Sequence, residues 1–400
     1  MEIIVKKFGG SSLENISKIK EIAEKIKQEI KDNNDNNKLH NFVIVVSAMA
    51  KTTNELVNYT LESSSLNSID KNREYDSIIS AGEQVSSGIL ALCLLEIGIK
   101  AKSLSGWKIP IYTDNNHKIA RIKHIHIDYI NNIINDGYLP IITGFQGINS
   151  NNDITTLGRS GSDISAVAIA AALQAKQCQI YTDVSGLCTA DPREVTNAKK
   201  ISHIQYNTAS EISINGAYVI HPRAIEIAQR YNLTLEIKST FLYNKSGTII
   251  DNKIMEQQEI KSIASQSNDM LFEITKIKCS HSLLTAINSQ NITIDILYHD
   301  FTSNKLLFKT HSQNKDLMIN ILNNMDYYSN TTLYENISII SIIGTGMILY
   351  SPITTQIIKY LDDHDIELIY LHTSEIKIQL IVEKKYLTLS LNLIHDLCKL

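Results

Sequence analysis

Short apolar segments alternate with helix-like segments along the first 245 residues, and this order constrains the fold most. Residues 3–8 are typical of a strand, and residues 42–46 (Phe-Val-Ile-Val-Val) form a continuous apolar run that favours a strand buried on both faces. Further strands are expected at residues 139–143, 179–182 and 233–237, with helices at 82–96, 163–175 and 222–230 between them. Repeated strand–helix–strand order predicts a mostly parallel sheet covered by helices on both sides.

The first helix is expected directly after Gly9-Gly10. Ser11 can cap its N-terminus, and Glu14 stands three residues later, as in a capping box. Apolar residues then recur at helical spacing on one face: Ile16, Ile19, Ala23, Ile26 and Ile30.

The alternation stops in a polar stretch at residues 244–262, where we place a boundary after a first domain of residues 1–245. A weak internal repeat follows, since residues 290–297 resemble residues 364–371, 74 positions later. Two small β-α-β-β-α modules, residues 263–335 and 336–400, are the simplest account.

Composition excludes several classes of function. The formal net charge of −4 and the pI near 6.3 argue against a nucleic-acid binder. No apolar run of about 18 residues is present, so neither a membrane span nor a signal peptide is expected. The five cysteines contain no C-x-x-C pair, which favours reduced thiols in the cytoplasm over disulfides or a zinc site.

Residues 7–12 (Lys-Phe-Gly-Gly-Ser-Ser) form the first candidate for anion binding. Two glycines allow the backbone to approach an anion, and helix N–H groups attract negative charge. Lys7 could then reach a transferring phosphoryl group. A plain strand–turn–helix junction with a surface lysine explains these residues equally well.

A second glycine-bearing loop, residues 155–163, precedes an Ala-rich helix. Arg159 offers a planar fork for a carboxylate, and Ser162 offers a further donor. The structural alternative makes Ser162 or Asp163 an N-cap and Arg159 a solvated charge. Two loops of this kind make that alternative less attractive.

Residues 181–193 follow a strand and are rich in turn formers. Asp183 could accept a hydrogen bond from a ribose or bind a metal, and Arg193 could meet phosphates at the carboxyl end of a sheet. An ordinary loop with a turn at Asp191-Pro192 is the alternative.

Glu83 also has a structural explanation. A capping box with Ser80 is a sufficient reason for a glutamate at this position. The chain has no P-loop, no G-x-G-x-x-G after a strand and no protein-kinase signature.

Taken together, these segments resemble the aspartate kinases of the amino-acid kinase family. The matching stretches occur in the family's order: residues 7–12, 47–49, 52–56, 81–83, 144–147, 155–163, 182–193, 221–223, 344–347 and 373–376. The resemblance implies a three-layer αβα sandwich with a mostly parallel sheet, followed by two ferredoxin-like ACT modules. It also implies ATP-dependent phosphorylation of the side-chain carboxylate of L-aspartate, the first step towards lysine, diaminopimelate, threonine and methionine.

The resemblance assigns roles residue by residue. Lys7 would neutralise the transferring phosphoryl group and Asp163 would orient Lys7. Aspartate would be positioned by five residues: Ser47, Thr53, Glu83 near its ammonium, Arg159 on its α-carboxylate, and Ser162. The nucleotide would be held by Lys7, Gly9, Gly10, Ser11, Thr182, Asp183, Cys188, Asp191, Arg193 and Tyr218. Mg²⁺ would bind to the phosphates of the nucleotide, and the chain itself is expected to supply no metal site.

Elementary chemistry agrees with this scheme. A carboxylate with a pKa of about 4 is already ionised at neutral pH, so the reaction needs positioning and charge neutralisation rather than a general base.

Three residues depart from the family pattern. Cys188 replaces an aromatic residue near the adenine, Tyr218 replaces a lysine of the nucleotide site, and Ser160 replaces a glycine.

The C-terminal modules imply feedback by lysine or threonine and assembly into a homodimer or higher oligomer. The first module carries residues 278–282 (Lys-Cys-Ser-His-Ser) where relatives often have an Asp-x-Pro-Gly effector loop, and the second is expected to lack a final strand that many relatives have. The alternatives are a sister kinase for acetylglutamate, glutamate or UMP, and a catalytically inactive amino-acid sensor. A fused homoserine dehydrogenase is not expected, because 400 residues leave no room for it.

Overall fold

The structure is a computed structural model that describes residues 2–35, 40–66, 68–253, 259–290, 292–347 and 351–400. The chain forms two compact units. The first comprises Met1–Leu187, Lys200–Ser213 and Tyr218–Met255, and the second comprises Cys188–Lys199, Ile214–Ala217 and Glu256–Leu400.

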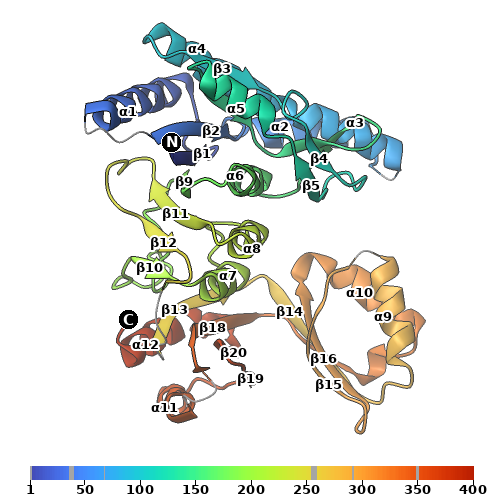
Figure 1. The fold of residues 1–400 in the computed structure, drawn as a ribbon. Coiled ribbons are helices and arrows are strands. Elements are labelled where there is room, and N and C mark those ends of the chain that lie inside the picture. Colours follow the sequence, from blue (N-terminus) through green and yellow to red (C-terminus); the bar gives the residue numbers. More distant parts are fainter. Residues whose placement is uncertain (1, 36–39, 67, 254–258, 291, 348–350) are drawn as a thin grey trace. The chain divides into compact units, whose positions relative to one another are not determined.

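An eight-stranded sheet forms the centre of the first unit (Figure 1). Its strand order is β10-β12-β11-β9-β1-β2-β6-β3, and its neighbours pair in parallel except for β11 with β12. The strands are β1 (Glu2–Phe8), β2 (His40–Val46), β3 (Ala101–Leu104), β6 (Leu139–Thr143), β9 (Gln177–Thr182), β10 (His203–Ile204), β11 (Thr234–Ser239) and β12 (Thr248–Ile250). The predicted, mostly parallel sheet is therefore confirmed.

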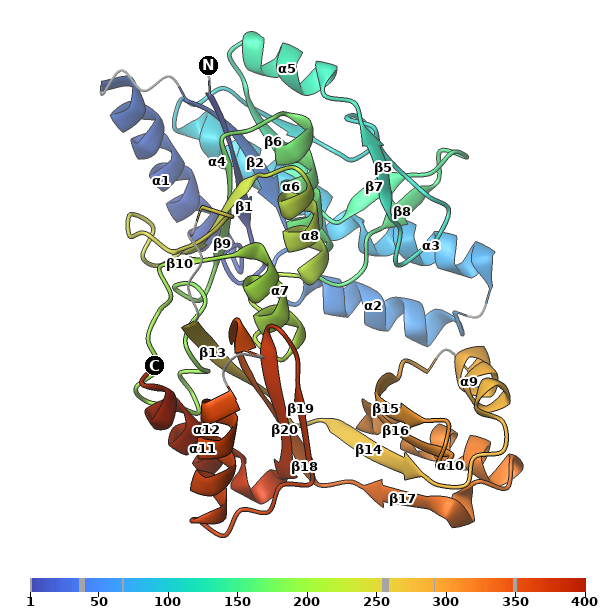
Figure 2. The same cartoon turned by 60° about the horizontal axis from the view of Figure 1, so that its bottom comes forward.

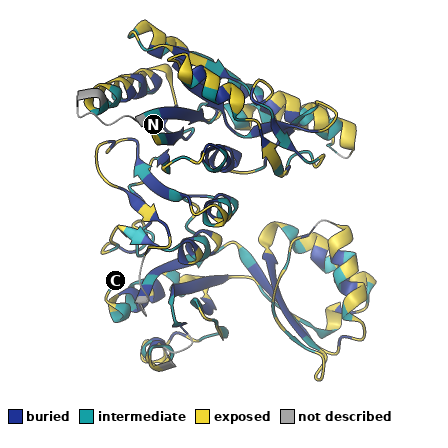
Figure 3. Ribbon diagram, in the orientation of Figure 1, coloured by how far each residue is buried: buried dark blue, intermediate teal, exposed yellow. Residues whose placement is uncertain are grey.

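Helices cover both faces of this sheet because alternate strand residues point to opposite sides. Ile4, Phe8 and Ile44 share one apolar cluster with residues of α1 (Ile16–Asp35) and α4 (Ala81–Glu96). Lys7 points to the other face, where α6 (Gly161–Ala172) lies on β1, β2 and β9. The sheet strands and α6 are buried over most of their length (Figure 3).

The remaining elements of the first unit surround the sheet. A small sheet has the strand order β5-β4-β7-β8, which sequence periodicity did not predict. Besides the main sheet, α1, α4 and α6, the first unit contains α2 (Thr52–Ser63), α3 (Ile69–Ile79), β4 (Ile111–Thr113), β5 (Ile122–Ile125), α5 (Asp128–Asn135), β7 (Gln146–Ile148), β8 (Ile154–Thr156), α7 (Tyr206–Ile214) and α8 (Pro222–Arg230).

The first helix does not begin where its apparent capping box predicts. After Gly9, the N–H groups of Ser12 and Leu13 donate to the Gly9 carbonyl in a separate turn, and α1 begins only at Ile16. Asn15 Oδ1 accepts from the Lys18 N–H, while Glu14 pairs with the Lys18 side chain. The prediction that Ser11 and Glu14 cap the first helix is therefore wrong. Ser11 lies in the turn before α1.

Helices α3 and α4 together form the stretch Ile69–Glu96, which is long and apolar enough to cross a membrane by length and composition. Half of its most apolar window is buried inside the protein, and Leu90 and Leu94 of α4 belong to the main core. A core helix passes the same test, so this stretch is weak support for a membrane span.

The second unit contains two small antiparallel sheets with helices (Figure 2). The first module has the strand order β15-β16-β14-β17 and the second β13-β18-β20-β19. The first comprises β14 (Asp269–Ile274), α9 (Ser280–Ser289), β15 (Asp295–Asp300), β16 (Lys305–His311), α10 (Lys315–Asn324) and β17 (Thr331–Tyr334). The second comprises β13 (Glu259–Gln266), β18 (Ile337–Thr345), α11 (Ser351–Asp362), β19 (Tyr370–Thr373), β20 (Lys377–Glu383) and α12 (Leu387–Cys398).

Strand β13 decides how the two modules are connected. It pairs with β18 at the position that β17 occupies beside β14 in the first module. The strand that the sequence predicts to be missing from the end of the second module is thus supplied by β13, which precedes the first module in the chain. The first module is therefore inserted into the second. The sequence placed the start of the first module at residue 263, whereas residues 263–266 belong to β13.

Candidate active site

The predicted site segments of the first unit meet at the carboxyl ends of β1, β2, β6 and β9. The Gly9 N–H donates to the Tyr181 carbonyl, and the Ser47 N–H donates to the Phe8 carbonyl. The Gly144 N–H donates to the Val46 carbonyl. Strand order reverses at β1, because β2 lies on one side and the later β9 on the other. Ligands of open α/β sheets bind at such a switch point.

Lys7 forms a buried ion pair with Asp163. Lys7 Nζ lies 2.6 Å from Asp163 Oδ1, and the two side chains are 11% and 6% exposed. Lys7 comes from the end of β1, in register with Val45 and Ile180 of the neighbouring strands, and Asp163 comes from the first turn of α6. A lysine tied to a helix-borne carboxylate is held in one place, which a surface lysine is not.

The turn after β1 packs too closely for side chains. A Cβ at Gly9 would lie 3.3 Å from Lys7 Nζ, and a Cβ at Gly10 would lie 3.0 Å from the Ala48 carbonyl oxygen. Because the Gly9 N–H is already bonded to Tyr181, the N–H groups of Gly10 and Ser11 are the better candidates for binding an anion. The plain-junction alternative does not explain this close packing around Lys7.

Glu83 is a buried carboxyl group with one oxygen to spare. Its Oε1 accepts the Ala48 N–H at 3.0 Å, whereas its Oε2 has no hydrogen-bond partner in the part of the chain that the structure describes. Burial raises its pKa to about 8, against the opposing effects of the Ala48 N–H and the nearby Lys7 charge. Ser80 Oγ donates to the Ser77 carbonyl and caps nothing, so the capping-box interpretation of Glu83 is wrong.

The loop before α6 presents Arg159 to solvent. Gly158 and Ser160 on either side have φ of 85° and 54°, and α6 begins at Gly161 without a side-chain cap. The expected alternative, Ser162 or Asp163 as N-cap, is therefore wrong. Among the described residues no carboxylate pairs with Arg159, whose Cζ lies 5.3 Å from the centre of the Tyr218 ring.

Two side chains that sequence reasoning missed hold this loop, the buried Asp76 and the half-buried Arg223. Asp76, on α3, accepts from the N–H and the hydroxyl of Thr156, at 3.1 and 2.6 Å, and from the Lys118 N–H. Arg223 donates to the carbonyl groups of Leu157 and Ala120, at 2.8 and 2.9 Å. The His-Pro-Arg stretch at 221–223 was the only signal of Arg223, and the mixed composition of α3 gave no signal of Asp76.

The other predicted substrate residues lie around this centre. Ser47 follows β2 and Thr53 lies in the first turn of α2; both are half-buried. Ser162 is buried against Gly144, where an added Cβ would lie 2.8 Å from its Oγ.

The predicted nucleotide residues divide between the two units. Thr182 ends β9, and its hydroxyl donates to Asp183 Oδ1 at 3.0 Å. Cys188, Asp191 and Arg193 belong to the second unit, not to the domain of residues 1–245 in which they were expected. There Asp191 Oδ2 lies 2.6 Å from Arg193 Nη2 in an exposed turn.

Similarity to known proteins agrees with the architecture. The profile of the amino acid kinase family matches residues 2–239. An aspartokinase from Rickettsia felis is 39% identical over 388 residues, which cover 96% of this chain and 95% of that protein. The chain belongs to the aspartokinases of the amino acid kinase family. Another aspartokinase, from Geobacillus stearothermophilus, is 36% identical over 408 residues, which cover 99% of this chain and 97% of that protein.

Solved structures share the fold of this aspartokinase-family chain. Aspartokinase III from E. coli, in complex with aspartate and ADP, has a TM-score of 0.80 at 21% identity over 99% of both chains. Aspartate kinase from Clostridium acetobutylicum has a TM-score of 0.77 at 22% identity over 98% of this chain and 99% of that one. The predicted αβα sandwich with two small α+β modules is thereby confirmed.

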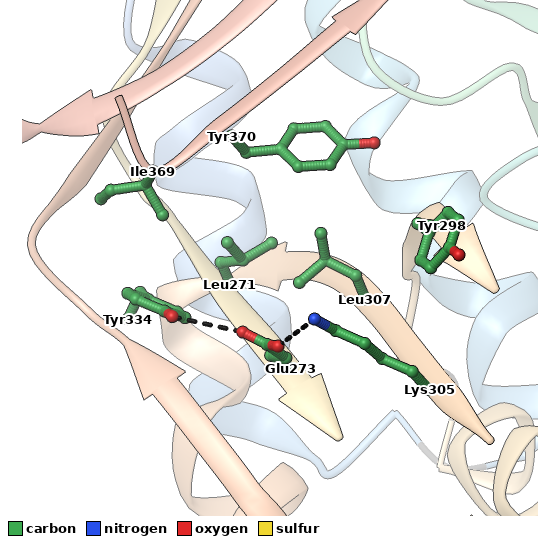
Figure 4. Close-up of a pocket in the computed structure, with 8 residues that line it drawn as sticks. All are labelled: Leu271, Glu273, Tyr298, Lys305, Leu307, Tyr334, Ile369 and Tyr370. Carbon is green, nitrogen blue, oxygen red and sulfur yellow. Dashed lines mark hydrogen bonds and ion pairs between the residues drawn. The ribbon is translucent and has the colours of Figure 1, made fainter. Parts of the chain in front are cut away.

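A separate cavity of about 280 Å³ lies within the second unit (Figure 4). Glu273 Oε1 lies 2.5 Å from Lys305 Nζ, and Tyr334 donates to Glu273 Oε2 at 3.2 Å. The remaining wall is aromatic and aliphatic: Leu271, Tyr298, Leu307, Ile369 and Tyr370. This combination suits a small molecule that is both charged and apolar.

Proposed function

We propose that this chain is an ATP-dependent aspartate kinase that converts the side-chain carboxylate of L-aspartate to the acyl phosphate, 4-phospho-L-aspartate. The observation that carries the proposal is the buried Lys7–Asp163 pair beside a glycine turn, at the point where strand order reverses. Family membership supports the same activity. The product places the reaction at the start of lysine, diaminopimelate, threonine and methionine synthesis.

Lys7 is proposed to act on the transferring phosphoryl group. The attacking carboxylate and the γ-phosphate are both anionic, so their repulsion is the main obstacle. Asp163 holds the Lys7 ammonium in place without reorganisation during the reaction. The side-chain carboxylate of aspartate is ionised at neutral pH and attacks directly.

Aspartate has complementary groups around Lys7. The spare Oε2 of buried Glu83 can accept a hydrogen bond from the α-ammonium, and that positive charge favours the ionised form of Glu83. The unpaired fork of Arg159 suits the α-carboxylate. Ser47, Thr53 and Ser162 add hydroxyl groups, so the side-chain carboxylate is left to face the phosphoryl donor.

Nucleotide binding is proposed for the N–H groups of Gly10 and Ser11, with Gly9 permitting the close turn around Lys7. Thr182, Asp183, Cys188, Asp191, Arg193 and Tyr218 complete the proposed nucleotide set. Among the described residues no group of three or more His, Cys, Asp or Glu side chains could hold a metal ion. Mg²⁺ commonly binds through substrate phosphates and keeps several waters, so it does not need a group of three protein ligands. When bound, Mg²⁺ neutralises phosphate charge.

A hydroxylamine trap tests the proposal. Purified protein is incubated with Mg·ATP and, separately, L-aspartate, N-acetylglutamate or glutamate, and hydroxamate is measured. We expect product with aspartate alone and none from Lys7→Ala, whereas Lys20→Ala, an exposed lysine on α1, should retain activity. Product with another acceptor would support a sister kinase. The absence of product with every acceptor would refute the kinase proposal and favour an inactive sensor.

Regulation by an amino acid is proposed for the second unit. E. coli aspartokinase III, whose TM-score is 0.75 at 22% identity, has also been solved with lysine and aspartate. In this chain the Glu273–Lys305 pair offers both charges that a zwitterion needs, beside three tyrosines. Lysine or threonine should then lower activity and raise the melting temperature. If both quantities stay unchanged, feedback by these two amino acids is refuted.

Assembly and location remain proposals as well. Exposed Ile296, Tyr298 and Phe301 on and beside the edge strand β15 support a homodimer or higher homo-oligomer, which light scattering of the purified protein would measure. None of the cysteines in the described part of the chain forms a disulfide, which supports a reducing, cytoplasmic location.

A further inference from the structure

The segment Cys188–Lys199, which contains Asp191 and Arg193, is built into the core of the second unit. Ala190 and Val195 are buried in one apolar cluster with Leu391 and Ile394 of α12. A loop that only connects two elements would lie on the surface with few buried side chains. This segment instead uses apolar residues on both sides of its exposed turn as anchors.

Helix α12 also binds the polar groups of this segment. Asn392 Nδ2 donates to the Glu194 carbonyl at 3.1 Å, and the Thr388 hydroxyl donates to Glu194 Oε2 at 2.7 Å. The ring nitrogen Nε2 of His395 lies 3.0 Å from the Thr189 hydroxyl. These contacts come from successive turns of one helix face.

The ends of the segment are held by the same unit. The Ile263 N–H, from β13, donates to the Thr189 carbonyl at 2.8 Å, and Ser262 Oγ donates to the Cys188 carbonyl at 2.9 Å. At the other end, Lys199 Nζ donates to the carbonyl oxygen of Leu400 at 3.1 Å.

Between these anchors the chain turns tightly and leaves its charges in solvent. The N–H groups of Glu194 and Val195 donate to the Asp191 carbonyl at 3.0 and 2.9 Å, which closes the turn. The position of Asp191 and Arg193 therefore depends on Glu194, the residue that α12 binds twice.

We propose that α12 of the second module positions the nucleotide-binding turn, with Asn392 and Thr388 as positioning residues for Asp191 and Arg193. The inference rests on the proposed function, because it takes the nucleotide role of Asp191 and Arg193 from it. It adds a specific consequence: a change in α12 alters nucleotide affinity and leaves aspartate affinity alone. The second module would then act on the reaction through the nucleotide.

The test uses the full chain with Asn392→Ala and Thr388→Val. Leu389→Ala, an exposed neighbour on α12, is the matched control. KM for Mg·ATP, KM for aspartate and kcat are measured, and Mg·ADP binding is titrated calorimetrically without turnover. Loss of one hydrogen bond should raise KM for Mg·ATP and Kd for Mg·ADP about 2- to 12-fold. KM for aspartate should not change, and the control should match the unmodified chain.

Rescue separates positioning from general stability. His395→Gln keeps a polar group near the Thr189 hydroxyl and should retain nucleotide affinity, whereas His395→Leu should weaken it within the same range of about 2- to 12-fold. Unchanged Mg·ADP affinity in Asn392→Ala and Thr388→Val would overturn the inference, as would equal changes of both KM values. If the unmodified chain binds Mg·ADP but phosphorylates no acceptor, the proposed function fails and the binding comparison still tests the role of α12.

Discussion

The guanidinium group of Arg159 lies over the ring of Tyr218, with Cζ 5.3 Å from the ring centre. The family resemblance places Tyr218 in the nucleotide site. In the structure Tyr218 also lies beside Arg159, the residue proposed to bind the α-carboxylate of aspartate. A flat ring beside Arg159 restricts the orientation of its fork without neutralising its charge.

Removing this ring should weaken aspartate binding. Tyr218→Ala is expected to raise KM for aspartate about 2- to 5-fold, the size of an exposed cation–π contact, in addition to the rise in KM for Mg·ATP that its proposed place in the nucleotide set predicts. Tyr218→Phe should behave like the unmodified chain, and Tyr231→Ala serves as control because Tyr231 is 62% exposed against 65% for Tyr218. A rise in KM for Mg·ATP alone would show that Tyr218 acts only in the nucleotide set.

The Lys7–Asp163 pair should be needed for turnover more than for binding. Asp163→Asn keeps the size of the side chain but removes the charge that holds Lys7, so kcat should fall by about 100-fold or more. KM for aspartate should change little. Steady-state kinetics and circular dichroism on the same sample check this. A normal kcat in a folded Asp163→Asn variant would show that Lys7 needs no orienting partner.

Glu83 predicts how activity depends on pH. Its pKa of about 8 in the ligand-free protein means that the ionised form, which binds the ammonium, increases as pH rises from 6 to 8. The value of kcat/KM for aspartate should therefore rise from about pH 6 to about pH 9, pass half of its maximum near pH 8 and level off above about pH 9, because kcat/KM reports the free enzyme. Glu83→Gln should lower kcat/KM and abolish this dependence. A flat profile in the unmodified chain would contradict the role of Glu83.

The same group has an opposite effect on stability. Burial favours the protonated form of Glu83 in the folded state, so its contribution is complete below its unfolded pKa of 4.5 and is lost as pH rises through about 8. Glu83→Gln, which stays neutral, should raise the melting temperature at pH 8.5 relative to the unmodified chain and much less at pH 5. Thermal unfolding at the two pH values, without ligands, measures this difference.

Lys6 and Glu29 form a second ion pair, on the opposite face of β1 from Lys7. Glu29 also accepts a hydrogen bond from the Tyr243 hydroxyl at 2.8 Å, and burial lowers the pKa of Lys6 to about 8. Glu29→Gln would leave the buried ammonium without its counter-charge and should cost about 1–3 kcal/mol of stability. Glu24→Gln, exposed on the same helix, is the control, and denaturant unfolding of both variants measures the difference.

Local sequence determined five of the eight strands of the main sheet, β1, β2, β6, β9 and β11, and the helices α1, α4, α6 and α8, but it gave no signal of β3, β10 and β12. The run at residues 42–46 is buried in β2, and the helix expected at 222–230 is α8 with the same bounds. Periodicity reports such elements because each depends on side chains a few residues apart. It failed at Ser11 and at Ser80, where a capping pattern is present but the surrounding chain uses the side chains differently.

The resemblance of sequence segments to the family also indicated which loops are proposed to carry the chemistry, those of Lys7, Glu83, Arg159 and Asp163. Only the tertiary structure decided their partners: Asp163 for Lys7, the Ala48 N–H for Glu83 and the Tyr218 ring for Arg159. It also decided that β13 completes the second module and that the turn at Asp191 folds with α12. These relationships join residues far apart in the chain, and packing and the burial of charge select them, which no local pattern records.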